Sequence, residues 1–108
     1  MAHRRIDLVY STDCPSVALA RIQIREALAT CGLEAAWREW RLDRDYVPEP
    51  LRDAGSPSVF VNGVDVVEEP VWTGRSCRRY SAPDGGLAGA PDAASIIEAL
   101  SLSRAVSA

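Results

Sequence analysis

Residues 55–67 contain the feature that constrains the fold most strongly, an Asn62-Gly63 pair between two short runs rich in β-branched residues. Asn and Gly tolerate the positive φ values of a two-residue hairpin turn, so the two runs are expected to pair as antiparallel strands. Pro57 directly precedes the first run, where its missing N–H removes no ladder hydrogen bond. The chain is therefore expected to contain a β-hairpin that starts just after Pro57.

The first third of the chain predicts a strand that leads into a helix. Residues 5–10 alternate as a strand whose largely apolar end indicates a central position in a sheet. Pro15 fits the first helical turn and Gly32 fits the position after the last one. Between them, apolar residues recur at helical spacing, namely Val17, Ala20, Ile24, Ala27, Leu28 and Cys31.

The remaining segments complete an α/β order of β-α-β-(α)-β-β-α. Alternation predicts a strand at 34–42, two prolines restrict the next helix to about 49–54, and a last helix runs from 91 to about 102. The right-handed crossover rule makes the first two strands parallel neighbours, and the hairpin adds antiparallel strands. We expect a four-stranded mixed sheet with helices on its faces. Residues 68–90 hold many Gly and Pro residues and are expected to form a long loop.

Size, charge and composition limit the class of protein. A chain of 108 residues is expected to form a single domain over 1–108, with its core at about 5–103. A net charge of −3 argues against nucleic acid as a partner. No bilayer-length apolar run or signal peptide is present, so we expect a cytoplasmic protein without a membrane partner. The sequence carries no prediction of oligomeric state.

The residue types also exclude several mechanisms. All 12 basic residues are arginines, which excludes lysine chemistry, and the only histidine is His3, near the N-terminus, which removes most Cys-His and Ser-His mechanisms. Three cysteines in a reducing compartment are expected to be thiols. Cys31 lies on the apolar helix face and is expected to be buried in the core.

Cys14 stands where the first strand gives way to the helix. Unpaired backbone N–H groups and the positive end of the helix dipole favour a thiolate at such a position. Asp13 opposes this effect if its carboxylate lies close to the sulfur. We expect Cys14 to be a reactive thiol.

Two motifs resemble the thioredoxin superfamily, and glutaredoxin most closely. Residues 9–17, Val-Tyr-Ser-Thr-Asp-Cys-Pro-Ser-Val, resemble the strand and Cys-Pro-x-Cys site of glutaredoxins. Residues 55–63 are similar to the family's cis-proline strand and hairpin, with Pro57 at the cis-proline. The chain is also similar to a group of small bacterial thioredoxin-like proteins, some labelled as organomercurial (alkylmercury) lyases. Their Ser-Cys-Arg-x-Tyr and Gly-Leu-x-Gly-x-Pro motifs match residues 76–80 and 86–91.

The resemblance, which covers roughly residues 5–103, implies a thioredoxin-like fold and a thiol-disulfide oxidoreductase with Cys14 as nucleophile. The resemblance implies that Pro57 exposes backbone groups that align an extended substrate. It also implies that Thr12, Asp13, Ser56 and Ser58 contact this substrate. The expected partner is a small or protein thiol or disulfide. Glutathione is expected as co-substrate, and no tightly bound cofactor is expected.

The chain departs from the glutaredoxin pattern in two places. The glycine that usually precedes the cysteine is missing, and Val17 stands where the second cysteine of Cys-x-x-Cys would be, so a dithiol cycle at the helix start is unavailable. The predicted topology returns the chain toward Cys14 before Cys77, so we hypothesise that Cys77 is the resolving thiol.

Two other functions remain open. Cys14 and Cys77 would form a two-thiolate site for Cu(I), Hg(II) or an organomercurial, the only metal site that the sequence suggests. The alternative is a non-redox module that uses the fold as a binding platform or pathway accessory. Whether the chain is an enzyme stays open at this point.

Overall fold

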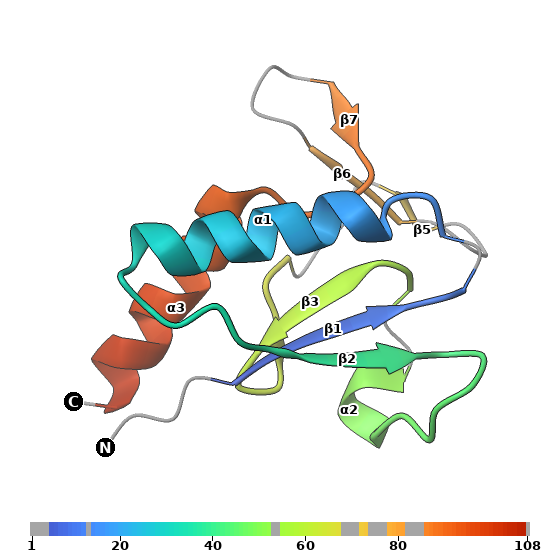
Figure 1. Cartoon of the computed structure of the whole chain (residues 1–108), viewed down its shortest axis with the longest axis horizontal. Coiled ribbons are helices and arrows are strands. Elements are labelled where there is room, and N and C mark those ends of the chain that lie inside the picture. Colours follow the sequence, from blue (N-terminus) through green and yellow to red (C-terminus); the bar gives the residue numbers. More distant parts are fainter. Residues whose placement is uncertain are drawn as a thin grey trace.

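The computed structural model describes residues 5–12, 14–52, 55–67, 72–73, 78–81 and 86–107. Helices and strands alternate along the first half of the chain, and short strands fill much of the second half (Figure 1). The elements are β1 (Ile6–Tyr10), α1 (Val17–Thr30), β2 (Arg38–Arg41), α2 (Glu49–Arg52), β3 (Ser58–Val61), β4 (Val64–Asp65), β5 (Trp72–Thr73), β6 (Arg78–Ser81), β7 (Leu87–Ala88) and α3 (Ala93–Ser107).

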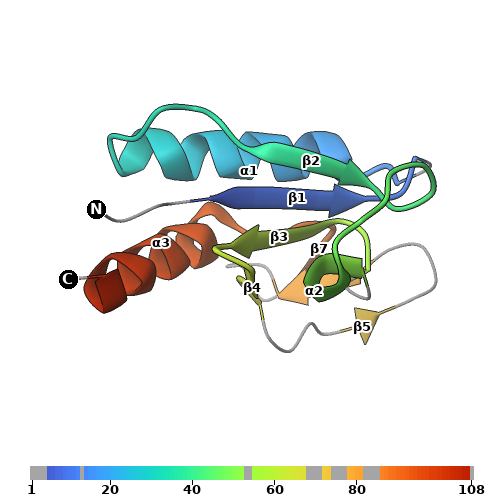
Figure 2. The same cartoon turned by 90° about the horizontal axis from the view of Figure 1, so that it is seen from below.

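The main sheet has four strands in the order β2-β1-β3-β4 (Figure 2). β1 runs parallel to β2, with Leu8 opposite Glu39, and antiparallel to β3, with Leu8 opposite Val59. β3 and β4 are antiparallel. The predicted mixed sheet, the central position of β1 and the parallel β1–β2 pair are therefore confirmed.

The turn between β3 and β4 has the predicted hairpin geometry. Asn62 has a φ of 50° and Gly63 a φ of 83°, the positive values that Asn-Gly tolerates best. Asn62 also contacts the chain at the start of β1: its backbone N–H donates to the Arg5 carbonyl and its Oδ1 accepts from the Arg5 N–H, each at 2.8 Å. The hairpin therefore fixes the position at which β1 begins.

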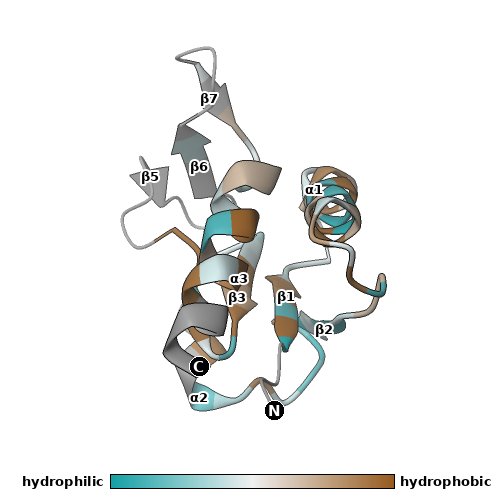
Figure 3. Cartoon of the chain, turned by 90° about the vertical axis from the view of Figure 1, so that its left-hand side faces the viewer, coloured by the Kyte–Doolittle hydropathy of each residue, from teal (hydrophilic) through white to brown (hydrophobic). Residues whose placement is uncertain are grey.

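Helices cover both faces of the main sheet. α1 and α3 pack together over one face, and α2 lies on the other (Figure 1, Figure 3). The α1–α3 face holds the larger core cluster, in which Ile24 and Ile96 are fully buried. The α2 face holds a smaller cluster, made of Val9, Val47, Leu51 and Phe60. β1 and β3 thus carry buried apolar side chains on both faces, as expected for inner strands, and Asp7 and Ser58 are the buried polar residues among them.

The end of α1 agrees with its sequence. Gly32 has a φ of 68°, and the Leu33 N–H donates to the Leu28 carbonyl at 2.9 Å, so Gly32 ends the helix as predicted. Cys31 caps this end and is only half-buried, although it packs against the core cluster. The expectation of a fully buried Cys31 was therefore too strong, because Cys31 is the C-cap that follows the last helical residue, Thr30, and remains partly exposed.

Residues 68–90, expected to form a long loop, contain three strands. β5, β6 and β7 form a second, antiparallel sheet in that order, with Thr73 opposite Arg78 and Tyr80 opposite Ala88. Strands of two to four residues between Gly and Pro residues are too short to show a period in the sequence. Two other boundaries also differ: β2 is shorter than 34–42, and α3 extends beyond 102.

Candidate functional site

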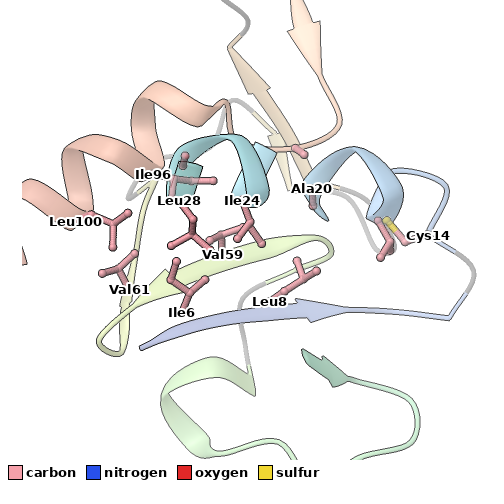
Figure 4. Packing of buried hydrophobic residues seen from close by; sticks show 13 residues of the cluster. Ile6, Leu8, Cys14, Ala20, Ile24, Leu28, Val59, Val61, Ile96 and Leu100 are labelled. Carbon is pink, nitrogen blue, oxygen red and sulfur yellow. The ribbon is translucent and has the colours of Figure 1, made fainter. Parts of the chain in front are cut away.

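The turn after β1 holds the cysteine of the predicted site. The Cys14 N–H donates to the Ser11 carbonyl at 3.0 Å, and Pro15 and Ser16 form a turn before α1 begins at Val17. Pro15 therefore precedes the helix and does not lie in its first turn, because Ser16 takes the N-cap position. Cys14 is only 8% exposed and belongs to the larger core cluster. Figure 4 shows it at one end of that cluster, beside the start of α1.

The segment before β3 lies beside this turn. The Ser11 N–H donates to the Ser56 Oγ at 2.9 Å, and Val9 is paired with Ser58 in the sheet. The Ser56–Pro57 peptide bond is cis, as the resemblance implies. The predicted convergence of the Cys14 turn and the Pro57 segment at one end of the sheet is confirmed.

Pro57 does not expose its backbone to solvent. Ser56, Pro57 and Ser58 are all buried, and the Pro57 carbonyl accepts a hydrogen bond of 2.5 Å from the Tyr80 hydroxyl. Tyr80 lies on β6 and is itself only 1% exposed. The expectation that Pro57 presents free backbone groups is wrong for this structure, because the second sheet supplies the hydrogen-bond donor.

The second sheet also contacts the start of α1. A Cβ on Gly89 would lie 2.0 Å from the Ser16 Oγ and 2.7 Å from the Ser16 Cβ, far inside normal contact distance. The next residue, Ala90, is buried in the same cluster as Cys14. Glycine at position 89 therefore permits a close approach of the chain after β7 to the helix start.

A polar network holds the other side of the Cys14 turn. Asp43 accepts hydrogen bonds from both the backbone N–H and the hydroxyl of Thr12, and Arg41 donates to the same hydroxyl oxygen. These bonds hold the pKa of the Asp43 carboxyl below its usual value, with the Thr12 hydroxyl as the largest cause. Thr12, predicted beside a substrate, is exposed and is engaged by its own chain.

Sequence reasoning found some of these residues and missed others. It found Cys14, Thr12 and residues 56–58, which the structure brings to one end of the sheet. It missed the contacts of Asp43 and Gly89 and the bond from Tyr80, although Tyr80 and Gly89 belong to the motifs at 76–80 and 86–91. Asp13 and Cys77 lie outside the described residues, so their predicted roles stay predictions.

Two searches of the coordinates bear on other classes of site. Among the described residues, no three His, Cys, Asp or Glu side chains gather in a way that would hold a metal ion. No helix in the described part of the chain has the length and apolar character needed to cross a bilayer.

Comparison of the chain with protein-family models, curated proteins and solved structures found no match.

The chemistry open to this arrangement is that of a single thiol. Cys14 precedes the N-terminus of a 14-residue helix, and a hydrogen-bonded turn holds it against the apolar core. A thiol in such a place is able to attack a disulfide or to bind a soft metal with a second thiolate. Its low exposure makes access to the sulfur the property that governs either reaction.

Proposed function

We propose that the chain has a thioredoxin-like fold and acts as a glutaredoxin-like thiol-disulfide oxidoreductase with Cys14 as its nucleophile. The observation that carries this proposal is the hydrogen bond from the Ser11 N–H to the Ser56 Oγ. It joins the Cys14 turn to the segment that holds Pro57, the two motifs on which the family resemblance rests. The strand order β2-β1-β3-β4 and the position of Cys14 after β1 support the same function.

The reaction proceeds by two exchanges of sulfur partners. The Cys14 thiolate attacks one sulfur of the substrate disulfide, the substrate S–S bond breaks, and the leaving thiolate takes a proton from water. A second thiol then attacks the mixed disulfide. If Cys77 attacks the Cys14 sulfur, a Cys14–Cys77 disulfide forms and the second half of the substrate leaves as a thiolate. If a low-molecular-weight thiol such as glutathione attacks the substrate sulfur, a disulfide between this thiol and the substrate forms and the Cys14 thiolate leaves. If Cys77 is the attacking thiol, two equivalents of the small thiol reduce the resulting Cys14–Cys77 disulfide.

Exchange with a small disulfide tests this function. Purified protein is mixed with hydroxyethyl disulfide and glutathione, and the rate of exchange is measured for the wild type, Cys14→Ser and Cys31→Ser. We expect Cys14→Ser to lose the protein-dependent rate and Cys31→Ser to retain it, since Cys31 lies at the far end of α1. A wild-type rate no higher than that of Cys14→Ser would overturn the proposal.

The role of Cys77 is tested in the same assay. In Cys77→Ser, the mixed disulfide at Cys14 is expected to accumulate when glutathione is omitted, and mass spectrometry of the intact protein detects it. An unchanged level of mixed disulfide assigns the second exchange to the small thiol alone.

One observation favours a second candidate, a non-redox binding module. Cys14 is 8% exposed, and the Tyr80 hydroxyl already engages the Pro57 carbonyl. This candidate predicts that Cys14 reacts with iodoacetamide in urea but not in the folded protein, whatever is done to Tyr80.

A further inference from the structure

Cys14 is nearly buried, whereas disulfide exchange requires an open approach to its sulfur. The attacking sulfur must reach the substrate disulfide along the direction of the S–S bond, so one side of the thiol must be clear of protein atoms. At 8% exposure, Cys14 does not offer this approach. Part of the chain around Cys14 therefore has to move before the proposed reaction occurs.

The second sheet is attached to the site by Tyr80. Its hydroxyl bonds the Pro57 carbonyl, and Pro57 follows Ser56, whose Oγ bonds the Ser11 N–H in the Cys14 turn. Two hydrogen bonds thus connect β6 to the turn that holds the thiol.

The second attachment lies just after β7. Gly89 fits against the Ser16 side chain, two residues beyond Cys14, and Ala90 shares the core cluster with Cys14. In Figure 1 the chain that leaves β7 passes the start of α1, in agreement with the contact between Gly89 and Ser16. The two attachments therefore lead to residues on both sides of Cys14 in the sequence: to Ser11 through Ser56, and to Ser16 directly.

We propose that β6 together with residues 86–90, here called the cover, closes the thiol site and opens to admit a disulfide. The contacts of Tyr80 and Gly89 determine how often the cover opens, and so how fast a disulfide reaches Cys14. This inference rests on the proposed function, because it concerns access to the same thiol.

Opening the cover exposes two of its described side chains that are buried, Tyr80 and Ala90. The cover belongs to a sheet that is separate from the main one, so it opens without breaking the ladder between β1 and β3. α1, in contrast, has five buried side chains facing the core and cannot move without exposing them. Segments with few buried contacts open locally while the rest of the fold stays intact.

Alkylation of Cys14 measures the opening. The wild type, Tyr80→Phe and Tyr46→Phe are treated with iodoacetamide in native buffer, and mass spectrometry follows the Cys14 peptide over time. Tyr80→Phe removes one hydrogen bond and is expected to raise the rate about fivefold, the factor that corresponds to an ordinary hydrogen bond. Tyr46 is 86% exposed, so the same substitution there is a matched control and should leave the rate unchanged.

Global destabilisation needs its own control. Ile96→Val removes one methyl group from a fully buried α3 residue outside the cover and lowers the free energy of unfolding of the whole fold. We expect Tyr80→Phe to react faster than Ile96→Val when the two are matched for urea midpoint. Equal rates would assign Cys14 exposure to global unfolding and would overturn the cover.

The glycine contact supplies a second, independent variant. Gly89→Ala is expected to push the cover away from the helix start and to raise the alkylation rate. Adding Ser16→Gly removes the two atoms that the new Cβ would meet, so the Ser16→Gly/Gly89→Ala protein should return toward the wild-type rate. A double variant as fast as Gly89→Ala alone would count against the cover.

The disulfide assay separates failure of the cover from failure of the proposed function. If the wild type exchanges disulfides through Cys14 but Tyr80→Phe and Gly89→Ala change neither alkylation nor exchange, the cover is wrong and the function stands. If these variants expose Cys14 to iodoacetamide yet none exchanges disulfides, the proposed oxidoreductase is wrong while the cover is supported.

Discussion

At the scale of single residues, Val17 separates this chain from a dithiol protein. It lies three positions after Cys14 and starts α1, and its side chain is buried in the same cluster as the thiol. The position that would hold the second sulfur of a Cys-x-x-Cys pair is therefore filled by an apolar side chain of the core. In the proposed reaction, the thiol that resolves the mixed disulfide at Cys14 must therefore come from elsewhere.

Val17→Cys is expected to restore a local disulfide. Pro15 and Ser16 occupy the turn between positions 14 and 17, and such turns bring their end Cα atoms within about 7 Å, close to disulfide range. In a Cys77→Ser background, which removes the alternative partner of Cys14, mild oxidation should remove two thiols from this variant, as measured by a thiol-specific dye. Cys14→Ser/Val17→Cys is the matched control and should keep its new thiol. If both proteins lose the same number of thiols, the turn geometry is incompatible with a disulfide.

Asp43 makes the stability of the Cys14 turn depend on pH. Bonds from Thr12 lower the pKa of its carboxyl in the folded protein, so the charged form stabilises the fold above the usual Asp pKa of about 3.9. This stabilisation is lost as the pH falls through the lower folded pKa. The urea midpoint of Asp43→Asn should therefore lie below that of the wild type at pH 7, and the gap should close in acid.

The exposed Glu26→Gln substitution on α1 is the control for this pH series. It removes a carboxylate from the surface without touching Thr12, so its midpoint should follow the wild type throughout. A gap between the wild type and Asp43→Asn that stays constant as the pH falls through the range in which the Asp43 carboxyl is protonated would show that its charge is not the stabilising factor.

At the scale of elements, α1 holds the thiol turn in place through one face. Ile24 is fully buried on that face, whereas Ile22 is 54% exposed. Ile24→Ala should lower the free energy of unfolding by about 2–5 kcal/mol because it leaves a cavity under the helix. Ile22→Ala makes the same chemical change on the solvent side and should cost under about 0.5 kcal/mol. Urea unfolding of the two variants measures the difference, and similar midpoints would contradict the packing of α1.

The elements that were predicted correctly are those whose local sequence determines them. The Asn62-Gly63 turn, the helix stop at Gly32 and the apolar face of α1 each depend on residues within a few positions. The strands of the second sheet do not, because two to four residues cannot show a period. Their positions depend on contacts such as Tyr80 with Pro57, which join residues 23 positions apart.

The same distinction explains how much of the candidate site was predictable. The meeting of Cys14 and Pro57 follows from strand order, because an antiparallel neighbour of β1 must start where β1 ends. The bonds of Asp43 to Thr12 and the fit of Gly89 on Ser16 depend on side-chain placement in three dimensions. No spacing in the sequence reports such contacts.

At the scale of the whole molecule, two separate sheets predict two levels of stability. Amides of β1 and β3 lie in the main sheet between helices and should exchange with solvent only on global unfolding. Amides of β6 should exchange faster, through opening of the cover. Hydrogen-exchange mass spectrometry of the wild type and Tyr80→Phe should show faster exchange at β6 and unchanged exchange at β1. Equal acceleration in both strands would indicate a single cooperative unit.

The Asn62-Gly63 turn, which fixes the sheet register, is also a site of chemical degradation. Asn-Gly is a dipeptide prone to deamidation, in which the Gly63 nitrogen attacks the Asn62 side-chain carbonyl and ammonia leaves. The isoaspartyl product carries an extra main-chain carbon, so the bonds between Asn62 and Arg5 can no longer both form as they do here. This change occurs at the end of β1 opposite Cys14, since Val61 pairs with Ile6. When the protein deamidates in storage, the main sheet is therefore expected to lose its hydrogen bonds first at the end farthest from Cys14.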